Sequence, residues 1–228
     1  MTQQVPVITI DGPSGSGKGT IARSVAKRLG WHLLDSGSLY RLVALAGQRH
    51  GLAADDEAGH EALALRLDAE FGLGPKGEER IRLDGEEVAA EIRTERCGEA
   101  ASRVAAMGPV RAALVQRQRA FAVPPGLVAD GRDMGTVIFP HARLKVFLTA
   151  SPEERARRRH KQLKEKGIDV SLAALSLEIA ERDRRDANRK IAPLRPADDA
   201  VILDSTSLSI DAVVDRVMEL AALRLPAN

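Results

Sequence analysis

The chain has 228 residues, of which 34 are Lys or Arg and 32 are Asp or Glu, giving a formal net charge of +2 at pH 7. This balance gives no reason to expect a nucleic-acid partner, and no apolar run approaches the roughly 18 residues that cross a membrane. The single cysteine, Cys97, excludes an internal disulfide framework. The start, Met1–Gln4, lacks the basic-then-apolar pattern of a secretory signal. We therefore expect one cytoplasmic α/β domain with insertions.

The first predicted elements enclose a glycine-rich loop. Apolar residues at Val5–Ile10 indicate a buried strand, and helical spacing over Ile21–Leu29 predicts a helix that Gly30 ends. Between them, GPSGSGK fits G-x-x-x-x-G-K, a loop whose backbone N–H groups surround a phosphate. A glycine-rich turn with an incidental lysine is the alternative. The predicted ATP-binding residues here are Gly12, Pro13, Ser14, Gly15, Ser16, Gly17, Lys18, Gly19 and Thr20.

Two positions in this loop have distinct predicted roles. Lys18 is expected to reach the β- and γ-phosphates of a nucleotide. Because Gly19 follows it, the hydroxyl that faces a metal ion is expected one position later, at Thr20. Loops that end K-G-T in this way are typical of nucleoside monophosphate kinases.

The next segments predict a second strand and then an insertion. Leu33 and Leu34 suit a short strand, followed by a helix that carries Arg41 one turn beyond Ser36. Residues 53–107 have a different character: helical patterns near 61–67 and 100–104 flank alternating residues and an Asp-Gly turn at 84–85. We expect a small β-containing subdomain there, outside the main sheet.

The main sheet is predicted to resume after this insertion. Strands are expected at 126–130, 144–148 and 200–204. Helices are expected from residue 152 to about 166, from 172 to about 189 and from Ser209 onward. The last helix has one apolar face, formed by Val213, Val214, Val217 and Leu220. Strands that alternate with helices predict a parallel, doubly wound sheet.

Charged residues follow these elements in an order that suits phosphate chemistry. Asp130 ends an apolar strand, which is the position of a carboxylate that holds Mg²⁺ through water near a phosphate loop. The alternative is an aspartate that caps a turn. Only 8 of the 34 basic residues are lysine, so 26 are arginine. The planar guanidinium group of arginine binds phosphate well, which is one reason for this excess. A genomic base composition that favours arginine codons is the alternative reason. Helical spacing predicts that one helix face carries Arg182, Arg185, Asp186 and Arg189, or alternatively that this is a solvated charged face.

The motifs GPSGSGKGT, LDSGSLYR, EIRTERCGEAASRVAA, ADGRDMGT and ERDRRDANR occur in an order and spacing that resemble the bacterial cytidylate kinase family. The resemblance covers essentially the full chain, with Cys97-Gly98 as a departure after EIRT. It implies a P-loop kinase fold in which ATP and Mg²⁺ phosphorylate CMP or dCMP. It also implies a core of residues 1–36, 108–152 and 190–228, a monophosphate-binding region at 37–107 and a mobile helical lid at 153–170.

The resemblance also assigns individual roles. It implies that Ser102, Arg111 and Asp133 read the cytosine edge. Arg182 and Asp186 would meet the ribose, and Arg41, Arg132 and Arg189 the phosphate. Ser36 joins the substrate site by the same resemblance. Lys18, Arg132 and Arg189 are the implied catalytic residues, while Thr20 and Asp130 are the implied metal-associated ones.

The basic segment RARRRHKQLK, residues 155–164, has no interleaved aromatic residues of the kind single-strand binders use. We therefore expect a lid whose Arg157 and Arg158 close over ATP and exclude water. We expect a monomer without a nucleic-acid or membrane partner.

Three other functions fit the sequence less well. A shikimate or adenylate kinase fits the insertion and GRDMGT less well, and a small GTPase would need an N-K-x-D motif, which is absent. The near-neutral charge and low aromatic content disfavour an RNA-associated P-loop protein.

Overall fold

The computed structural model describes residues 5–73, 79–165 and 167–225. The parts of the predictions that concern residues 1–4, 74–78, 166 and 226–228 lie outside this description.

The chain divides into two compact units. The first consists of Met1–Asp35 and Gln118–Asn228, and the second of Ser36–Arg117. The expected monophosphate-binding region, 37–107, lies within the second unit, as do residues 108–117, which were expected in the core.

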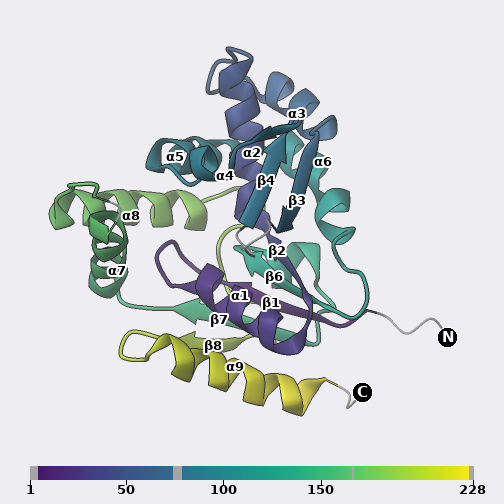
Figure 1. The fold of residues 1–228 in the computed structure, drawn as a ribbon, viewed down its shortest axis with the longest axis vertical. Helices are drawn as coiled ribbons and strands as arrows, with labels where there is room; N and C mark the ends of the chain where they lie inside the picture. Colours follow the sequence, from purple (N-terminus) through teal and green to yellow (C-terminus); the bar gives the residue numbers. More distant parts are fainter. Residues whose placement is uncertain (1–4, 74–78, 166, 226–228) are drawn as a thin grey trace. The chain divides into compact units, whose positions relative to one another are not determined.

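The first unit is built on a five-stranded sheet in the order β2-β6-β1-β7-β8, and every pairing between neighbours in it is parallel (Figure 1). Its strands are β1 (Val7–Asp11), β2 (His32–Asp35), β6 (Leu127–Gly131), β7 (Leu144–Thr149) and β8 (Val201–Asp204). The predicted parallel sheet is confirmed. β1 begins two residues later and ends one residue later than predicted.

The order of the strands places β1 at the centre, between β6 and β7. Asp11, the last residue of β1, is in register with Gly131 on one side and Phe147 on the other. Parallel α/β sheets bind ligands beyond the carboxyl ends of their strands, where the strand order reverses. The glycine-rich loop leaves β1 at this point of the sheet.

Two helices, α1 (Lys18–Leu29) and α9 (Ile210–Arg224), pack on the sheet and build its core. Ile8, Val128 and Val146 contribute from the strands, and the predicted apolar face of α9 is buried against them. Burying one such aliphatic side chain stabilises a fold by about 1.5–3 kcal/mol. Gly30 ends α1 in the left-handed conformation, with φ 66°, which confirms the predicted stop.

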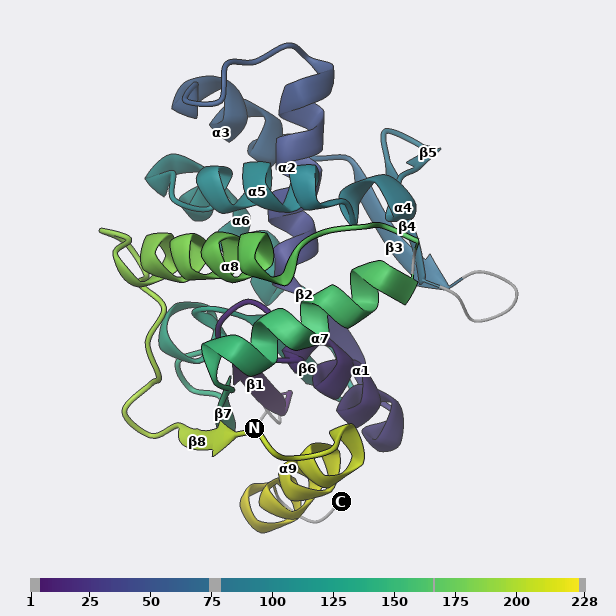
Figure 2. The same cartoon turned by 90° about the vertical axis from the view of Figure 1, so that its left-hand side faces the viewer.

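Helices α7 (Pro152–Glu165) and α8 (Leu172–Ala187) pack against each other, as the turned view in Figure 2 shows. α8 ends at Ala187, two residues before its predicted end near Arg189. The N–H of Leu194 donates to the carbonyl of Asp186 at 2.8 Å, the acceptor that a continuing helix would offer to residue 190. Arg189 therefore lies beyond the helix.

The second unit combines helices with a small antiparallel sheet, which confirms the prediction of a β-containing subdomain outside the main sheet. The sheet has the order β3-β4-β5, and the tight turn between β4 and β5 places Asp84 and Gly85 at φ 52° and 79°. Its elements are α2 (Ser36–Arg49), α3 (Glu57–Leu65), β3 (Ala69–Leu73), β4 (Glu79–Leu83), β5 (Glu86–Glu87), α4 (Ala89–Ile92), α5 (Glu95–Val104) and α6 (Gly108–Arg119).

Candidate active site

The predicted strand–loop–helix arrangement of the phosphate loop is confirmed, because the loop joins β1 to α1. At Gly12 a Cβ atom would lie 2.1 Å from the carbonyl oxygen of Leu148 in β7, so no residue with a side chain fits there without moving the backbone. Gly17 is the N-cap of α1 in the left-handed conformation, and its carbonyl accepts from Thr20 N and Ile21 N at 3.0 and 3.1 Å. The loop therefore wraps tightly onto the end of the sheet.

Lys18 is the first residue of α1, and its ammonium donates to the carbonyl of Pro13 at 3.1 Å, across the loop. Burial, together with the charge of Arg132, lowers the pKa of Lys18 to about 7, while Asp130 and Asp186 oppose that shift. An anion in the loop would restore the charge of this amine, because an opposite charge nearby favours the ionised form. Lys18 is thus buried and poised to meet a phosphate.

Asp130 lies beside the start of α1, where its Oδ2 is 3.1 Å from the position that a Cβ on Gly19 would occupy. Thr20, one residue further on, is exposed. Within the described ranges, no three His, Cys, Asp or Glu side chains are grouped to hold a metal ion. Mg²⁺ usually keeps several waters and takes only one or two carboxylates besides the substrate phosphates. One buried carboxylate next to a phosphate loop fits that mode of binding.

A buried cluster of ion pairs joins the C-terminal part of α8 to the segment that follows β6. The Nε of Arg132 donates to Asp186 Oδ2 at 3.0 Å, and Arg189 donates to Asp186 Oδ1. Burial would raise the pKa of Asp186, which is fully buried, but the charges of Arg132, Arg189 and Arg182 outweigh it and hold the pKa below the usual value. Arg185, predicted on the same face, instead pairs with Glu181 at 2.9 Å.

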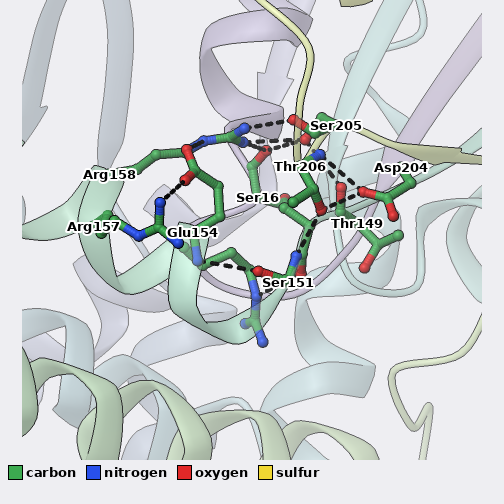
Figure 3. A network of polar contacts seen from close by, with 11 residues as sticks. Ser16, Thr149, Ser151, Glu154, Arg157, Arg158, Asp204, Ser205 and Thr206 are labelled. Atoms are coloured by element: carbon green, nitrogen blue, oxygen red, sulfur yellow. Dashed lines mark hydrogen bonds and ion pairs between the residues drawn. The ribbon is translucent and has the colours of Figure 1, made fainter.

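The arginines of α7 fall into two groups. Arg158 donates to the carbonyls of Ser16 and Ser205 at 3.2 and 2.5 Å and to the hydroxyl of Ser205 at 3.1 Å, so it lies against the back of the phosphate loop (Figure 3). Arg157 pairs with Glu154 at 3.4 Å, the carboxylate that also accepts from Arg158 at 3.0 Å, and 65% of the Arg157 side chain is exposed (Figure 3). Arg157 is therefore the more accessible of the two predicted lid arginines.

In the second unit the predicted substrate residues lie on α2, α5 and α6. Arg41 donates to the carbonyls of Ile92 and Thr94, the latter at 3.1 Å. Arg111 lies over the ring of Tyr40, with its guanidinium carbon 5.7 Å from the ring centre, and is buried. Ser36 and Ser102 are buried too.

Two details of α5 bear on these residues. The hydroxyl of Ser102 has no hydrogen-bond partner among the residues that the structure describes. A Cβ on Gly98 would lie 2.8 Å from the guanidinium of Arg41, so the glycine in the Cys97-Gly98 departure gives that side chain room. The Cys97 thiol, whose pKa burial raises, donates to the carbonyl of Arg41 at 3.5 Å.

Comparison with known proteins is consistent with this geometry. Residues 8–223 match the cytidylate kinase family. The chain belongs to the cytidylate kinase family. It is 59% identical over 219 residues to a cytidylate kinase of Nitrosococcus oceani, covering 96% of each chain, and 60% identical over 220 residues, again 96% of each, to that of Pseudomonas aeruginosa. An uncharacterized protein from Eubacterium ventriosum has a similar fold, with a TM-score of 0.50 and 10% identity over 96% of this chain and 99% of that one.

The structure of this cytidylate kinase family member brings some of the predicted site residues together. It places Lys18, the rest of the loop and Asp130 at the carboxyl end of the sheet, and joins Arg132, Asp186 and Arg189 in one cluster. Asp133 is buried and is the N-cap of η1 (Met134–Ile138), a short π-helical turn directly after the Arg132 position.

Sequence reasoning missed two buried residues of this cytidylate kinase family member. Asp11, at the end of β1, accepts hydrogen bonds from Met134 N at 2.9 Å and Gly135 N at 2.8 Å, and burial raises its pKa to about 7. Its position directly before the glycine-rich loop was a usable signal. Arg155, beside the loop on α7, had none, because it stands among several arginines in the sequence.

No helix in the described part of the chain has the length and apolar character needed to cross a membrane.

Proposed function

We propose that this protein transfers the γ-phosphoryl group of ATP to CMP or dCMP, giving ADP and CDP or dCDP. The observation that carries the proposal is the 59–60% identity with cytidylate kinases over nearly the full length of the chain. The phosphate loop with a buried lysine supports the same reaction.

The acceptor needs little chemical activation. A nucleoside monophosphate has a second phosphate pKa near 6, so its attacking oxygen is already mostly ionised at pH 7 and requires no general base. The catalytic task is to align two highly charged phosphates and to neutralise their repulsion. A buried lysine and buried arginines, held in place before substrate binds, suit that task because they need little reorganisation.

On the donor side, we propose that residues 12–20 bind the ATP phosphates and that Lys18 stabilises charge on the transferred group. Asp130, through water, and Thr20 would hold the Mg²⁺, which when bound neutralises charge on the ATP phosphates. Arg157 and Arg158 on the lid, residues 153–170, would complete the ATP site. The exposure of Arg157 supports a role that awaits the nucleotide.

On the acceptor side, we propose that Arg132 and Arg189 bind phosphate as catalytic residues, with Arg41 as a further phosphate ligand. Arg182 and Asp186 would contact the ribose. Ser36, Ser102, Arg111 and Asp133 would form the rest of the substrate site, with the last three reading the cytosine edge. The buried Ser102 hydroxyl, which has no partner among the described residues, supports such a role, since a buried polar group left unpaired costs about 1–3 kcal/mol.

The test is an acceptor screen with ATP and Mg²⁺, in which ADP release is followed with CMP, dCMP, UMP, AMP or shikimate. We expect CMP and dCMP to be the best acceptors and UMP to be much poorer. Faster turnover of AMP, UMP or shikimate than of CMP would refute the proposal. Lys18→Met is the control for a contaminating kinase. We also propose a cytoplasmic monomer without nucleic-acid or membrane partners, which light scattering at the assay concentration tests for oligomeric state.

A further inference from the structure

Arg155 is a buried charged residue to which the proposed reaction gives no task. It lies in the first turn of α7 and only 5% of it is exposed. Its Nε donates to the carbonyl of Ala150 at 3.1 Å. Its Nη1 donates to the carbonyl of Ser14 at 3.0 Å and to Asp183 Oδ2 at 2.5 Å. One side chain therefore joins the end of β7, the phosphate loop and α8.

The contact with Ser14 fixes the direction of one peptide group in the loop. The peptide bond between Ser14 and Gly15 is trans, since the cis bond among the described residues joins Pro124 and Pro125. In a planar trans peptide the N–H points opposite to the C=O. Because the carbonyl of Ser14 points to Arg155, the N–H of Gly15 points away from α7. Arg155 thus binds the loop from behind and leaves that N–H on the opposite side for an anion.

Close packing supports the same arrangement. Gly15 has a φ of 76°, and a Cβ there would lie 3.1 Å from the Cβ and 3.2 Å from the carbonyl oxygen of Arg155. The loop backbone therefore rests directly on the first turn of α7, and the guanidinium contact adds a hydrogen bond to this packing.

Asp183 supplies the negative charge that a buried guanidinium needs. Removing one partner of a buried ion pair is strongly destabilising, because it leaves an uncompensated charge. Asp183 also lies one helical turn before Asp186, the residue that binds Arg132 and Arg189. The Arg155–Asp183 pair therefore links the phosphate loop to the helix that carries the arginine-binding carboxylate.

We propose that Arg155 is a positioning residue, which orients the Ser14–Gly15 peptide for binding the ATP phosphates, and that Asp183 acts through Arg155. The proposal rests on the proposed function of the loop as the ATP site.

The test compares nucleotide binding by calorimetry in the full-length protein, for Arg155→Met, Asp183→Ala and the double variant. Lys27→Met, which replaces an exposed charge in the last turn of α1, is the matched control. For Arg155→Met we expect the Kd of Mg-ATP to rise about tenfold, the change that 1.4 kcal/mol produces. We expect the Kd of CMP, measured without ATP, to stay within about twofold of the wild-type value. A threefold rise in a Kd, which corresponds to roughly 0.6 kcal/mol, counts as a significant loss of affinity. The double variant should be no worse for ATP than Arg155→Met, because among the described residues Arg155 is the side chain that hydrogen-bonds to both Asp183 and the loop.

Thermal unfolding of each variant separates positioning from general damage. If Arg155→Met does not fold, Arg155→Lys takes its place: it keeps the charge beside Asp183 but cannot reproduce the guanidinium fork, so a several-fold rise in the ATP Kd is expected. A folded variant with wild-type ATP affinity, or equal losses for ATP and CMP, overturns the proposal. Additive losses in the double variant overturn the role given to Asp183. A wild-type protein that binds ATP but does not phosphorylate CMP would refute the proposed reaction, while the ATP comparison would still decide the role of Arg155.

Discussion

Replacing Asp11 by asparagine should change how the stability of the protein depends on pH. Burial raises the pKa of Asp11 to about 7 in the folded chain, from 3.8 as the ordinary value. Between these two values the folded state binds more protons than the unfolded state, so stability falls as pH rises through this window and is level above it. Three pKa units correspond to about 4 kcal/mol, of which about 3 kcal/mol should be lost between pH 5 and pH 8.

Asp11→Asn removes this titration, because an amide stays neutral. It also removes one hydrogen bond, because Met134 N and Gly135 N donate to different oxygens of Asp11 and the NH2 group that replaces one oxygen cannot accept. An unpaired buried group costs about 1–3 kcal/mol. Urea unfolding at pH 5, 6, 7 and 8 measures both effects. The variant should be less stable than the wild type at pH 5 and should gain on it steadily up to pH 7–8. A difference between the two proteins that does not vary with pH would show that the carboxyl group ionises normally.

Three further predictions concern the loop and the arginine cluster. Lys18→Met should lower kcat by about 10²–10³-fold, by analogy with the removal of one preorganised electrostatic contact, and single-turnover kinetics should place the loss in the chemical step. Asp186→Ala should reduce kcat/KM for CMP and dCMP, because Arg132 and Arg189 lose their shared carboxylate. The reduction should be larger for CMP, which has a 2′-hydroxyl, whereas Arg189→Met should reduce kcat/KM for both substrates equally. Equal losses in Asp186→Ala would exclude the 2′-hydroxyl contact. Gly12→Ala should abolish ATP binding and lower the Tm by about 2–4 °C for each kcal/mol lost, and retention of wild-type ATP affinity would contradict the close approach to Leu148.

Most of the fold was predictable because its signals are local. The β-branched run before the loop, the helical spacing after it, the glycine at position 30 and the Asp-Gly turn at 84–85 each act through the conformation of a few neighbouring residues. The end of α8, two residues before the predicted one, involves a contact outside the helix, because the carbonyl of Asp186 accepts from Leu194, eight residues further along the chain.

The site divides in the same way. The phosphate loop is a contiguous motif, so its residues could be named from the sequence. The partners of the buried charges could not, because Arg155 and Asp183, or Asp11 and Gly135, are brought together only by the packing of strands and helices. The resemblance to a family named the arginines that are expected to contact substrate. It was silent on Arg155, which contacts the loop instead.

The central place of β1 has a consequence for the dynamics of this protein. All five of its residues are buried, and it is hydrogen-bonded to a strand on each side, so no local opening frees its backbone amides without breaking two ladders. Amide protons of β1 should therefore exchange with solvent only when the whole first unit unfolds. The loop that follows is held by a strand that does not fray, so little of the free energy of nucleotide binding is spent on ordering the base of the loop.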